Sequence, residues 1–232
     1  ATGMASKAEI CIHTRIAASA VKATTMDRPE WVDAHPGKAE VYVALTNNKN
    51  RGKKPNRCGD ATPLNGPNPR AENNYGQILR WRADGHDHGA MTFSWDLFVL
   101  AGNPTQHNDE YAGSRNINAD NMFNSPDGLG FDSQGWLWIQ TDGKASNKGD
   151  FAGQGNNQML MGDPGTGEIR RFMVGPKECE ITELCWSSDK RTMFVYIQHP
   201  GEKGGSHFPD GGTSVPRSCV IAVTRDDGGV VG

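Results

Sequence analysis

The sequence predicts an all-β protein in which about three four-stranded blades form an open arc of a β-propeller. Two observations predict this fold. Short apolar runs of strand length follow one another along the chain, and one acid-strand-turn-strand pattern occurs three times. Gly, Asn, Asp and Pro residues bound nearly every run, as turns between strands require. Sheet is therefore the main element, and helix a minor one.

The elements are expected in the following order. A short helix is predicted over 14–24, where Ala, Ile and Val residues recur near helical spacing. The clearest predicted strands are 40–45, 76–81, 95–101, 135–141, 158–162, 168–174, 192–198 and 219–224. The stretches 47–74 and 102–121, rich in Pro, Asn and Asp, are predicted as long loops of the kind that is usually functional or disordered.

The repeated pattern divides the chain into blades. Each of the segments 29–46, 126–141 and 180–198 has an acid at a strand start, a polar turn and an aromatic strand. Inner strands of propeller blades have this pattern. We therefore predict a single partial propeller domain over 1–232, with a lead-in at 1–25 and blades at 26–101, 124–175 and 178–232. Propellers usually close with four to eight blades, so three leave exposed edge strands.

Composition narrows the function classes. The chain has 232 residues, with 24 Lys and Arg against 27 Asp and Glu, a net charge of -3. This balance argues against binding nucleic acid or an anionic membrane surface. No apolar run is long enough to span a membrane, and the first twenty residues lack the order of a signal peptide. The five cysteines are scattered without a C-x-x-C spacing, so neither a disulfide framework nor a structural zinc is indicated.

Blade topology brings the repeated acids together. The start of a first strand and the end of a second lie on the same face of the disc, so Glu30, Asp127 and Glu180 should converge near a central channel. Asn124, at the end of an Asn-rich stretch, can add a further oxygen. Carboxylates and amides without paired cations are what calcium selects. A single acid at a strand start is usually a turn former or a solvated group, but three at one repeat phase favour a metal site.

Other polar residues near this rim have two readings. Arg28 is either a weak surface ion pair or a bidentate fork for an oxyanion. His199 in the sequence QHPG is expected to order a turn. Cys179 is expected in the core, because strand alternation points it away from the side that Glu180 faces.

Several of these segments resemble one known family, the PhoX-type alkaline phosphatases. The segments are 26–31 (MDRPEW), 125–129 (SPDGL), 135–139 (GWLWI), 141–143 (TDG), 179–182 (CEIT) and 197–202 (IQHPGE). The resemblance extends from Thr14 to the DDGG sequence at 226–229. It covers only the C-terminal half of the family, so the N-terminal ligands, including an iron-binding cysteine, are missing. Glu183 also stands where a small residue is expected.

The resemblance implies a six-bladed propeller that hydrolyses phosphomonoesters in the periplasm or outside the cell, with ferric iron and calcium as cofactors in its channel. It implies that Glu30 is an iron ligand, that Arg28 is a catalytic residue that contacts the substrate phosphate, and that Asn124, Asp127 and Glu180 supply oxygens at or near calcium. The fragment alone is expected to be inactive, and to pair with the missing N-terminal half or with a second copy.

Two other functions remain open at this stage. Calcium-dependent lactonases or esterases also place acids and amides around a propeller channel, although Arg28 favours phosphate. A non-catalytic propeller segment that only binds calcium or a partner is the alternative from a different class.

Overall fold

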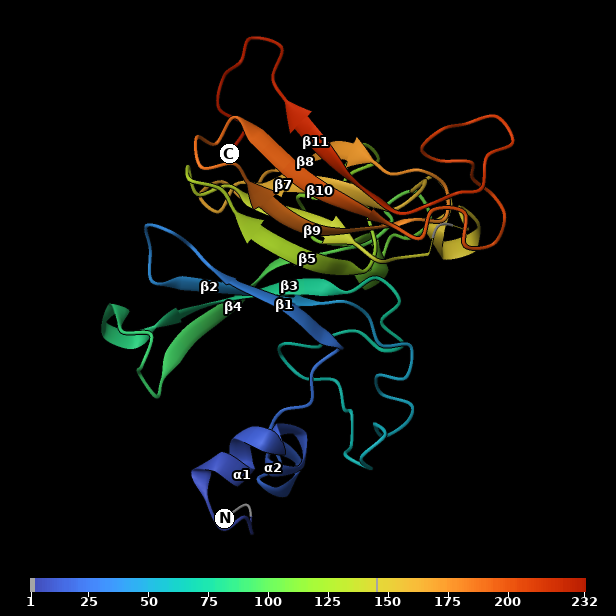
Figure 1. Ribbon diagram of the computed structural model, residues 1–232. Helices are drawn as coiled ribbons and strands as arrows, with labels where there is room; N and C mark the ends of the chain where they lie inside the picture. Colours follow the sequence, from blue (N-terminus) through green and yellow to red (C-terminus); the bar gives the residue numbers. More distant parts are fainter. Residues whose placement is uncertain (1–2, 145) are drawn as a thin grey trace.

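The computed structural model describes residues 3–144 and 146–232. The chain begins with two short helices, α1 (Lys7–Ile12) and α2 (Thr14–Ala20). Helix α2 begins where the sequence predicts and ends four residues early, whereas α1 was not predicted. Ser6 caps α1, because its hydroxyl accepts a hydrogen bond from the backbone N–H of Glu9 at 3.1 Å. Both helices lie apart from the sheets in Figure 1.

The rest of the described chain is built on three antiparallel sheets, so the all-β prediction is confirmed. The first has the order β1 (Pro29–Ala34), β2 (Glu40–Leu45), β3 (Gln77–Ala83), β4 (Phe93–Leu100). The second has the order β5 (Pro126–Phe131), β6 (Leu137–Thr141), β7 (Gln158–Gly162), β8 (Ile169–Val174). The third consists of β9 (Glu180–Trp186), β10 (Thr192–Gln198) and β11 (Cys219–Thr224), with β10 in the middle.

The third sheet corrects the expectation of four strands in each blade. It has three among the described residues, and the segment after β11 forms turns. That segment has three glycines in its last seven residues, 226–232, and Gly228 has a positive φ of 68°. Glycine weakens a strand because it gains no side-chain packing and loses more backbone entropy on ordering.

The sheets stack face to face through two apolar cores, with the second sheet in the middle. Strand β6 shows the arrangement. Leu137 and Ile139 face the first sheet, where they join a cluster with Tyr42, Ile78 and Val99. Trp138, between them in sequence, faces the third sheet and clusters with residues of β9 and β10 such as Ile181 and Val195. Alternate side chains of a strand point to opposite faces, so every residue of β6 is buried.

The first strands of the three sheets, β1, β5 and β9, lie next to one another. Strand β5 contacts both β1 and β9, and the three sheets form successive layers in Figure 1. A side chain–backbone contact joins the first two sheets, because Asp33 Oδ2 accepts a hydrogen bond from the Phe131 N–H at 2.8 Å. This bond joins the C-terminal ends of β1 and β5.

Both predicted long loops lack regular strands and contain mainly turns, isolated bridges and one short 3-10 helix, Glu110–Ala112. Two fully buried arginines hold the first loop, residues 47–74, against the sheet. Arg70 donates to the backbone carbonyls of Ala101 and Gly76, and Arg51 pairs with Asp27. Other short 3-10 helices are Asp84–His86 and Gly149–Phe151. No helix in the described part of the chain has the length and apolarity needed to cross a membrane.

Candidate functional site

Arg28 and Glu30 lie at the exposed N-terminal end of β1. The Arg28 Nη2 is 3.7 Å from Oε1 of Glu30, and about half of each side chain is exposed. Its Nη1 also lies 3.5 Å from Oδ1 of Asn47, just after β2. A pair this exposed contributes little to stability. The guanidinium therefore remains free to engage another anion.

The backbone at Arg28 has an unusual conformation that is repeated in the second sheet. Arg28 has φ 51° and Ser125 has φ 54°, and each precedes the proline that starts the first strand of its sheet. Their carbonyls accept equivalent hydrogen bonds, from the Thr46 N–H and the Asp142 N–H, both at 3.1 Å. A left-handed conformation costs a non-glycine residue about 1–2 kcal/mol, and such strain is concentrated at functional sites.

The first strand of each sheet also has an irregular register near its predicted site residue. The irregularities lie between Pro29 and Val32 in β1, between Pro126 and Leu129 in β5, and opposite the pair Val195/Tyr196 in β9. Bulges of this kind change the direction of side chains and are common beside active sites. The repetition supports a shared role for the three strand starts.

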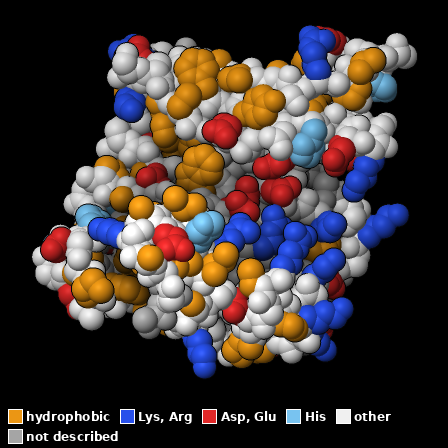
Figure 2. All heavy atoms as spheres, turned by 60° about the horizontal axis from the view of Figure 1, so that its bottom comes forward, with side chains coloured by type: hydrophobic (Ala, Val, Ile, Leu, Met, Phe, Trp, Pro, Cys, Tyr) orange, Lys and Arg blue, Asp and Glu red, His pale blue; other side chains and the backbone are white. Residues whose placement is uncertain are grey.

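Three half-buried carboxylates, those of Asp127, Asp142 and Glu180, influence one another at these strand starts. Burial is the largest cause that raises the pKa of each. The charge of Asp127 raises the pKa of Asp142 further, and both raise that of Glu180 to about 7. Arg28 opposes the rise at Asp127 and Asp142. Figure 2 shows acidic side chains gathered at a hollow in one face, with basic side chains beside them.

Two neighbours hold the Glu180 carboxylate in place. Gln198 Nε2 donates a hydrogen bond to Oε2 at 2.9 Å, and His199 Nε2 lies 3.6 Å from the same oxygen. The contact with His199 lowers the Glu180 pKa, but less than burial and the two aspartates raise it. His199 also lies in a turn, because its N–H donates to Ser218 Oγ. Its predicted turn position is confirmed, and its position beside Glu180 is new.

Asn124 lies deeper than the carboxylates, and its side chain is used within the fold. Its Oδ1 accepts hydrogen bonds from the Ser125 hydroxyl at 3.1 Å and from the Lys144 N–H at 3.0 Å, and its Nδ2 donates to Gln154. A side chain at Gly143 would collide with this Oδ1, so glycine is required there. Asn124 therefore orders the segment that carries Asp142.

Some acids near these strand starts do not belong to the cluster formed by Asp127, Asp142 and Glu180. Asp27 is buried and pairs with Arg51 at 2.7 Å. Glu178 is partly exposed and accepts hydrogen bonds from the backbone N–H groups of Lys203 and Gly205, which lower its pKa. Cys179 is 1% exposed in the core, as predicted, and burial raises the pKa of its thiol to about 12.

The donor chemistry of Asp127, Asp142 and Glu180 suits a hard cation. Carboxylates with raised pKa values lack enough positive charge around them, which a bound cation would supply. Among residues 3–144 and 146–232, no three His, Cys, Asp or Glu side chains converge closely enough to hold a metal ion.

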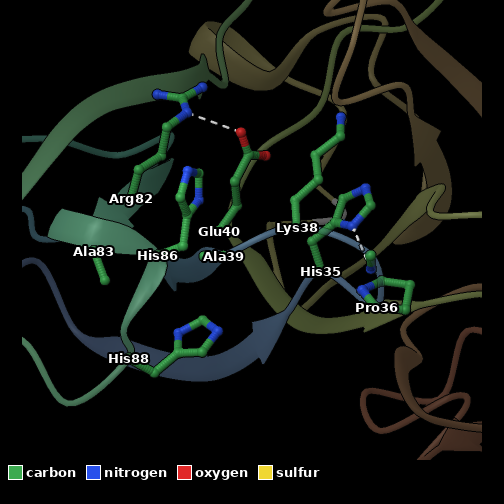
Figure 3. Close-up of a pocket in the computed structure, with 10 residues that line it drawn as sticks. His35, Pro36, Lys38, Ala39, Glu40, Arg82, Ala83, His86 and His88 are labelled. Atoms are coloured by element: carbon green, nitrogen blue, oxygen red, sulfur yellow. Dashed lines mark hydrogen bonds and ion pairs between the residues drawn. The ribbon is translucent and has the colours of Figure 1, made fainter.

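A groove of about 660 Å³ lies at the opposite end of β1 from Arg28. It is formed by the β1–β2 turn and the β3–β4 loop, and His35, His86 and His88 line it together with Lys38 (Figure 3). Inside it Glu40 pairs with Arg82 at 2.8 Å. The groove is thus separate from the cluster of Asp127, Asp142 and Glu180.

Known proteins share the sequence and the fold of this chain. A family model described as alkaline phosphatase PhoX matches residues 1–201. The chain belongs to the PhoX family of alkaline phosphatases. A solved structure, "Pseudomonas fluorescens PhoX in complex with vanadate, a transition state analogue", matches with a TM-score of 0.93 and 59% sequence identity. The match covers 99% of this chain and 39% of that one, so the chain spans about two fifths of the PhoX structure. No curated protein matches the chain significantly.

The departure noted at Glu183 has a structural reason in this PhoX chain. Glu183 has φ 51° and is the extra residue of the irregular pairing in β9, between Thr182 and Leu184. A positive φ in a bulge favours glycine, so a small residue was a reasonable expectation there. The side chain of Glu183 is exposed, and its carbonyl accepts a hydrogen bond from Gln140 Nε2 at 3.1 Å.

Sequence reasoning missed two features of this PhoX site. Asp142 lies in the TDG segment at 141–143, but it follows a second strand, so the pattern of acids at first-strand starts does not point to it. The Asp27–Arg51 ion pair was not foreseen, because 24 residues separate its partners and nothing local signals their contact.

Proposed function

We propose that the whole protein is a metal-dependent phosphomonoesterase, and that this chain supplies the C-terminal part of its site. The observation that carries the proposal is a half-exposed guanidinium, that of Arg28, beside half-buried carboxylates with raised pKa values. A phosphoryl group would use both features. Its oxygens can accept hydrogen bonds from the guanidinium, and the carboxylates can hold the cations that neutralise its charge. Membership of the PhoX family supports this chemistry.

The site is proposed to lie at the mouth of a propeller channel. In this arrangement the three sheets are consecutive blades of a six-bladed ring, with boundaries at 26–101, 124–175 and 178–232. The contacts of β5 with β1 and β9, and the stacking of the sheets through two cores, support it. Residues at the starts of β1, β5 and β9 then face one channel.

Calcium and ferric iron are the proposed cofactors. Glu30, Asp127 and Glu180 would hold them, and Asp142 adds a fourth carboxylate. Asn124 orients the segment that carries Asp142 through its hydrogen bond with the Lys144 N–H. The remaining ligands, including a cysteine for iron, would come from the rest of the protein. Bound cations supply positive charge against the phosphoryl oxygens and lower the pKa of water.

The residues of this chain have distinct roles in the proposed reaction. Arg28 turns from Glu30 to the equatorial oxygens of the substrate, where its planar fork binds two of them. This contact strengthens as charge develops, which is the condition for lowering the barrier. Thr46 holds the Asp127 carboxylate through a 3.0 Å hydrogen bond. No side-chain nucleophile is required.

Two open apolar faces support pairing with the rest of the protein or with a second copy. Phe93 and Trp95 are exposed on the face of the first sheet that is turned away from the second. Val220 is exposed on the outer face of the third sheet, beside its partner Tyr196. Exposed apolar faces of this kind mark interaction surfaces. A periplasmic or secreted location of the whole protein follows from its family alone.

One comparison tests the proposed function. Bound calcium and iron, and turnover of an aryl phosphate, are measured for this 232-residue chain and for the full-length protein. We expect the full-length protein to bind both metals and turn over, and the isolated chain to lose most of the metal and the activity, because a site loses affinity with each missing ligand. Parental turnover by the isolated chain would contradict the inactive-fragment proposal. Calcium binding with lactonase activity, or with no hydrolysis, would support the other two functions.

A further inference from the structure

Asp27, the residue before Arg28, is a fully buried acid, and its side chain is held from two directions. Its Oδ1 accepts a hydrogen bond from Arg51 Nε at 2.7 Å, and its Oδ2 accepts one from Asn73 Nδ2 at 2.9 Å. Its backbone N–H donates to Oδ1 of Asn68 at 2.9 Å. Both Asp27 and Arg51 have side chains that are 0% exposed. The long loop 47–74 therefore holds both the side chain and the backbone N–H of Asp27.

Arg51 spreads this restraint over the segment that leads to Arg28. Its Nη2 donates to the carbonyl of Thr25 at 2.9 Å, and its Nη1 donates to the Thr25 hydroxyl and to the carbonyl of Pro63. The guanidinium contacts Thr25 and Asp27, which lie just before Arg28 in sequence, and anchors both to the loop at Pro63.

Arg28 itself adopts a backbone conformation that needs such an anchor. Its φ of 51° lies in the left-handed region, and it is followed by a proline. Its N–H donates to the Met26 carbonyl at 3.1 Å, and its carbonyl accepts the Thr46 N–H at 3.1 Å. A strained residue keeps its conformation only where the surrounding structure over-determines it. The buried pair on its N-terminal side and β2 on its C-terminal side supply that restraint.

We propose that the buried Asp27–Arg51 ion pair, together with Asn73, is a positioning unit that aims the Arg28 guanidinium at the phosphoryl group. The inference rests on the proposed role of Arg28 in phosphate binding, and it adds three residues that do not touch the substrate. It also gives the long loop 47–74 a function, because that loop carries both Arg51 and Asn73. Misplacing a binding group by about 1 Å can reduce a rate by roughly 100-fold, so fixing the backbone here matters for turnover.

The test uses Asp27→Asn in the full-length protein, because asparagine keeps the shape and removes the charge. We expect kcat/KM for an aryl phosphate to fall about 10- to 100-fold, and inhibition by vanadate to weaken by a similar factor, with bound calcium and iron unchanged. Arg51→Lys keeps the charge and loses the contacts to Thr25 and Pro63, so it gives the same test if Asp27→Asn does not fold. Asp96→Asn is the matched control, because it breaks another arginine–aspartate pair, Arg80–Asp96 at 2.6 Å, at a distance from Arg28 along the sheet. It should lower the midpoint of thermal unfolding without changing vanadate inhibition.

A double-mutant cycle separates positioning from a general loss of stability. If Asp27 acts through Arg28, Asp27→Asn should change vanadate inhibition less than twofold once Arg28 is already alanine. Equal effects of Asp27→Asn with and without Arg28, or wild-type vanadate inhibition in Asp27→Asn and Arg51→Lys, would overturn the positioning role. An Arg28→Ala variant with full activity would instead overturn the proposed function itself, so the two failures are distinguishable.

Discussion

The Thr46 hydroxyl donates a 3.0 Å hydrogen bond to Oδ1 of Asp127, and so links the end of β2 in the first sheet to the start of β5 in the second. These residues are 81 positions apart in sequence. The bond lowers the pKa of Asp127, against the larger effect of burial, which raises it. A residue of one sheet thus favours the charged form of a carboxylate in the next.

Replacing Thr46 with valine should weaken metal binding. Valine keeps the shape and removes the donor, so the pKa of Asp127 should rise, and calcium affinity of the full-length protein should fall about tenfold. Calcium titration monitored by calorimetry measures the effect. Thr62→Val is the control, because the Thr62 hydroxyl donates to the Lys54 carbonyl inside the loop and touches no carboxylate of the group. Equal calcium affinities of Thr46→Val and the unmodified protein would refute the prediction.

Arg28 and Glu30 should respond differently to substitution in the full-length protein. Arg28→Ala should reduce turnover about 10²- to 10³-fold with the metal content intact, since it removes a contact to the substrate. Arg28→Lys should recover only part of this, because an ammonium lacks the planar fork. Glu30→Gln should lower bound metal together with the rate. Metal analysis beside turnover decides both roles. Full activity of Arg28→Ala, or a full metal complement in Glu30→Gln, would contradict the role concerned.

The raised pKa of Glu180 predicts a pH-dependent loss of stability in the metal-free protein. Between its ordinary value of 4.5 and about 7, the folded chain holds a proton that the unfolded chain has released. The free energy of unfolding should therefore fall as pH rises through this window, by roughly 2 kcal/mol, and stay level above it. Glu180→Gln removes this penalty, so with a chelator present it should raise the unfolding midpoint by about 5 °C at pH 8 and leave it unchanged at pH 4.5.

Glu178→Gln provides the control of opposite sign. Backbone N–H groups of Gly205 and Lys203 lower the pKa of Glu178, so its charged form stabilises the fold. Glu178→Gln, only two residues away from Glu180, should therefore lower the unfolding midpoint at pH 8. If Glu180→Gln also lowers the midpoint at pH 8, burial and the charges of Asp127 and Asp142 do not destabilise ionised Glu180 as described.

The isolated chain should associate through its open sheet faces. Sedimentation velocity should give a mass that rises with concentration, and Phe93→Glu, on the outer face of the first sheet, should weaken association at least about tenfold. Met91→Glu is the matched control, because Met91 is 94% exposed and precedes β4. A monomeric mass that does not change with concentration would exclude pairing of two copies.

The sequence by itself determined most of the strands, because turn residues bound them and their apolar pattern is local. The strands Glu40–Leu45, Gln158–Gly162, Thr192–Gln198 and Cys219–Thr224 have the predicted bounds. It also placed Glu30, Asp127 and Glu180 at strand starts, because a repeat keeps its phase along the chain.

Only the tertiary structure decided which polar residues act on one another. Asp27 and Glu30 look alike in sequence, yet one is buried against Arg51 and the other is half exposed beside Arg28. Asp142 and His199 gain their importance from carboxylates that lie close in space but far away in sequence, those of Asp127 and Glu180. Burial and charge interactions depend on distances in space between residues far apart in sequence, and no local pattern encodes those distances.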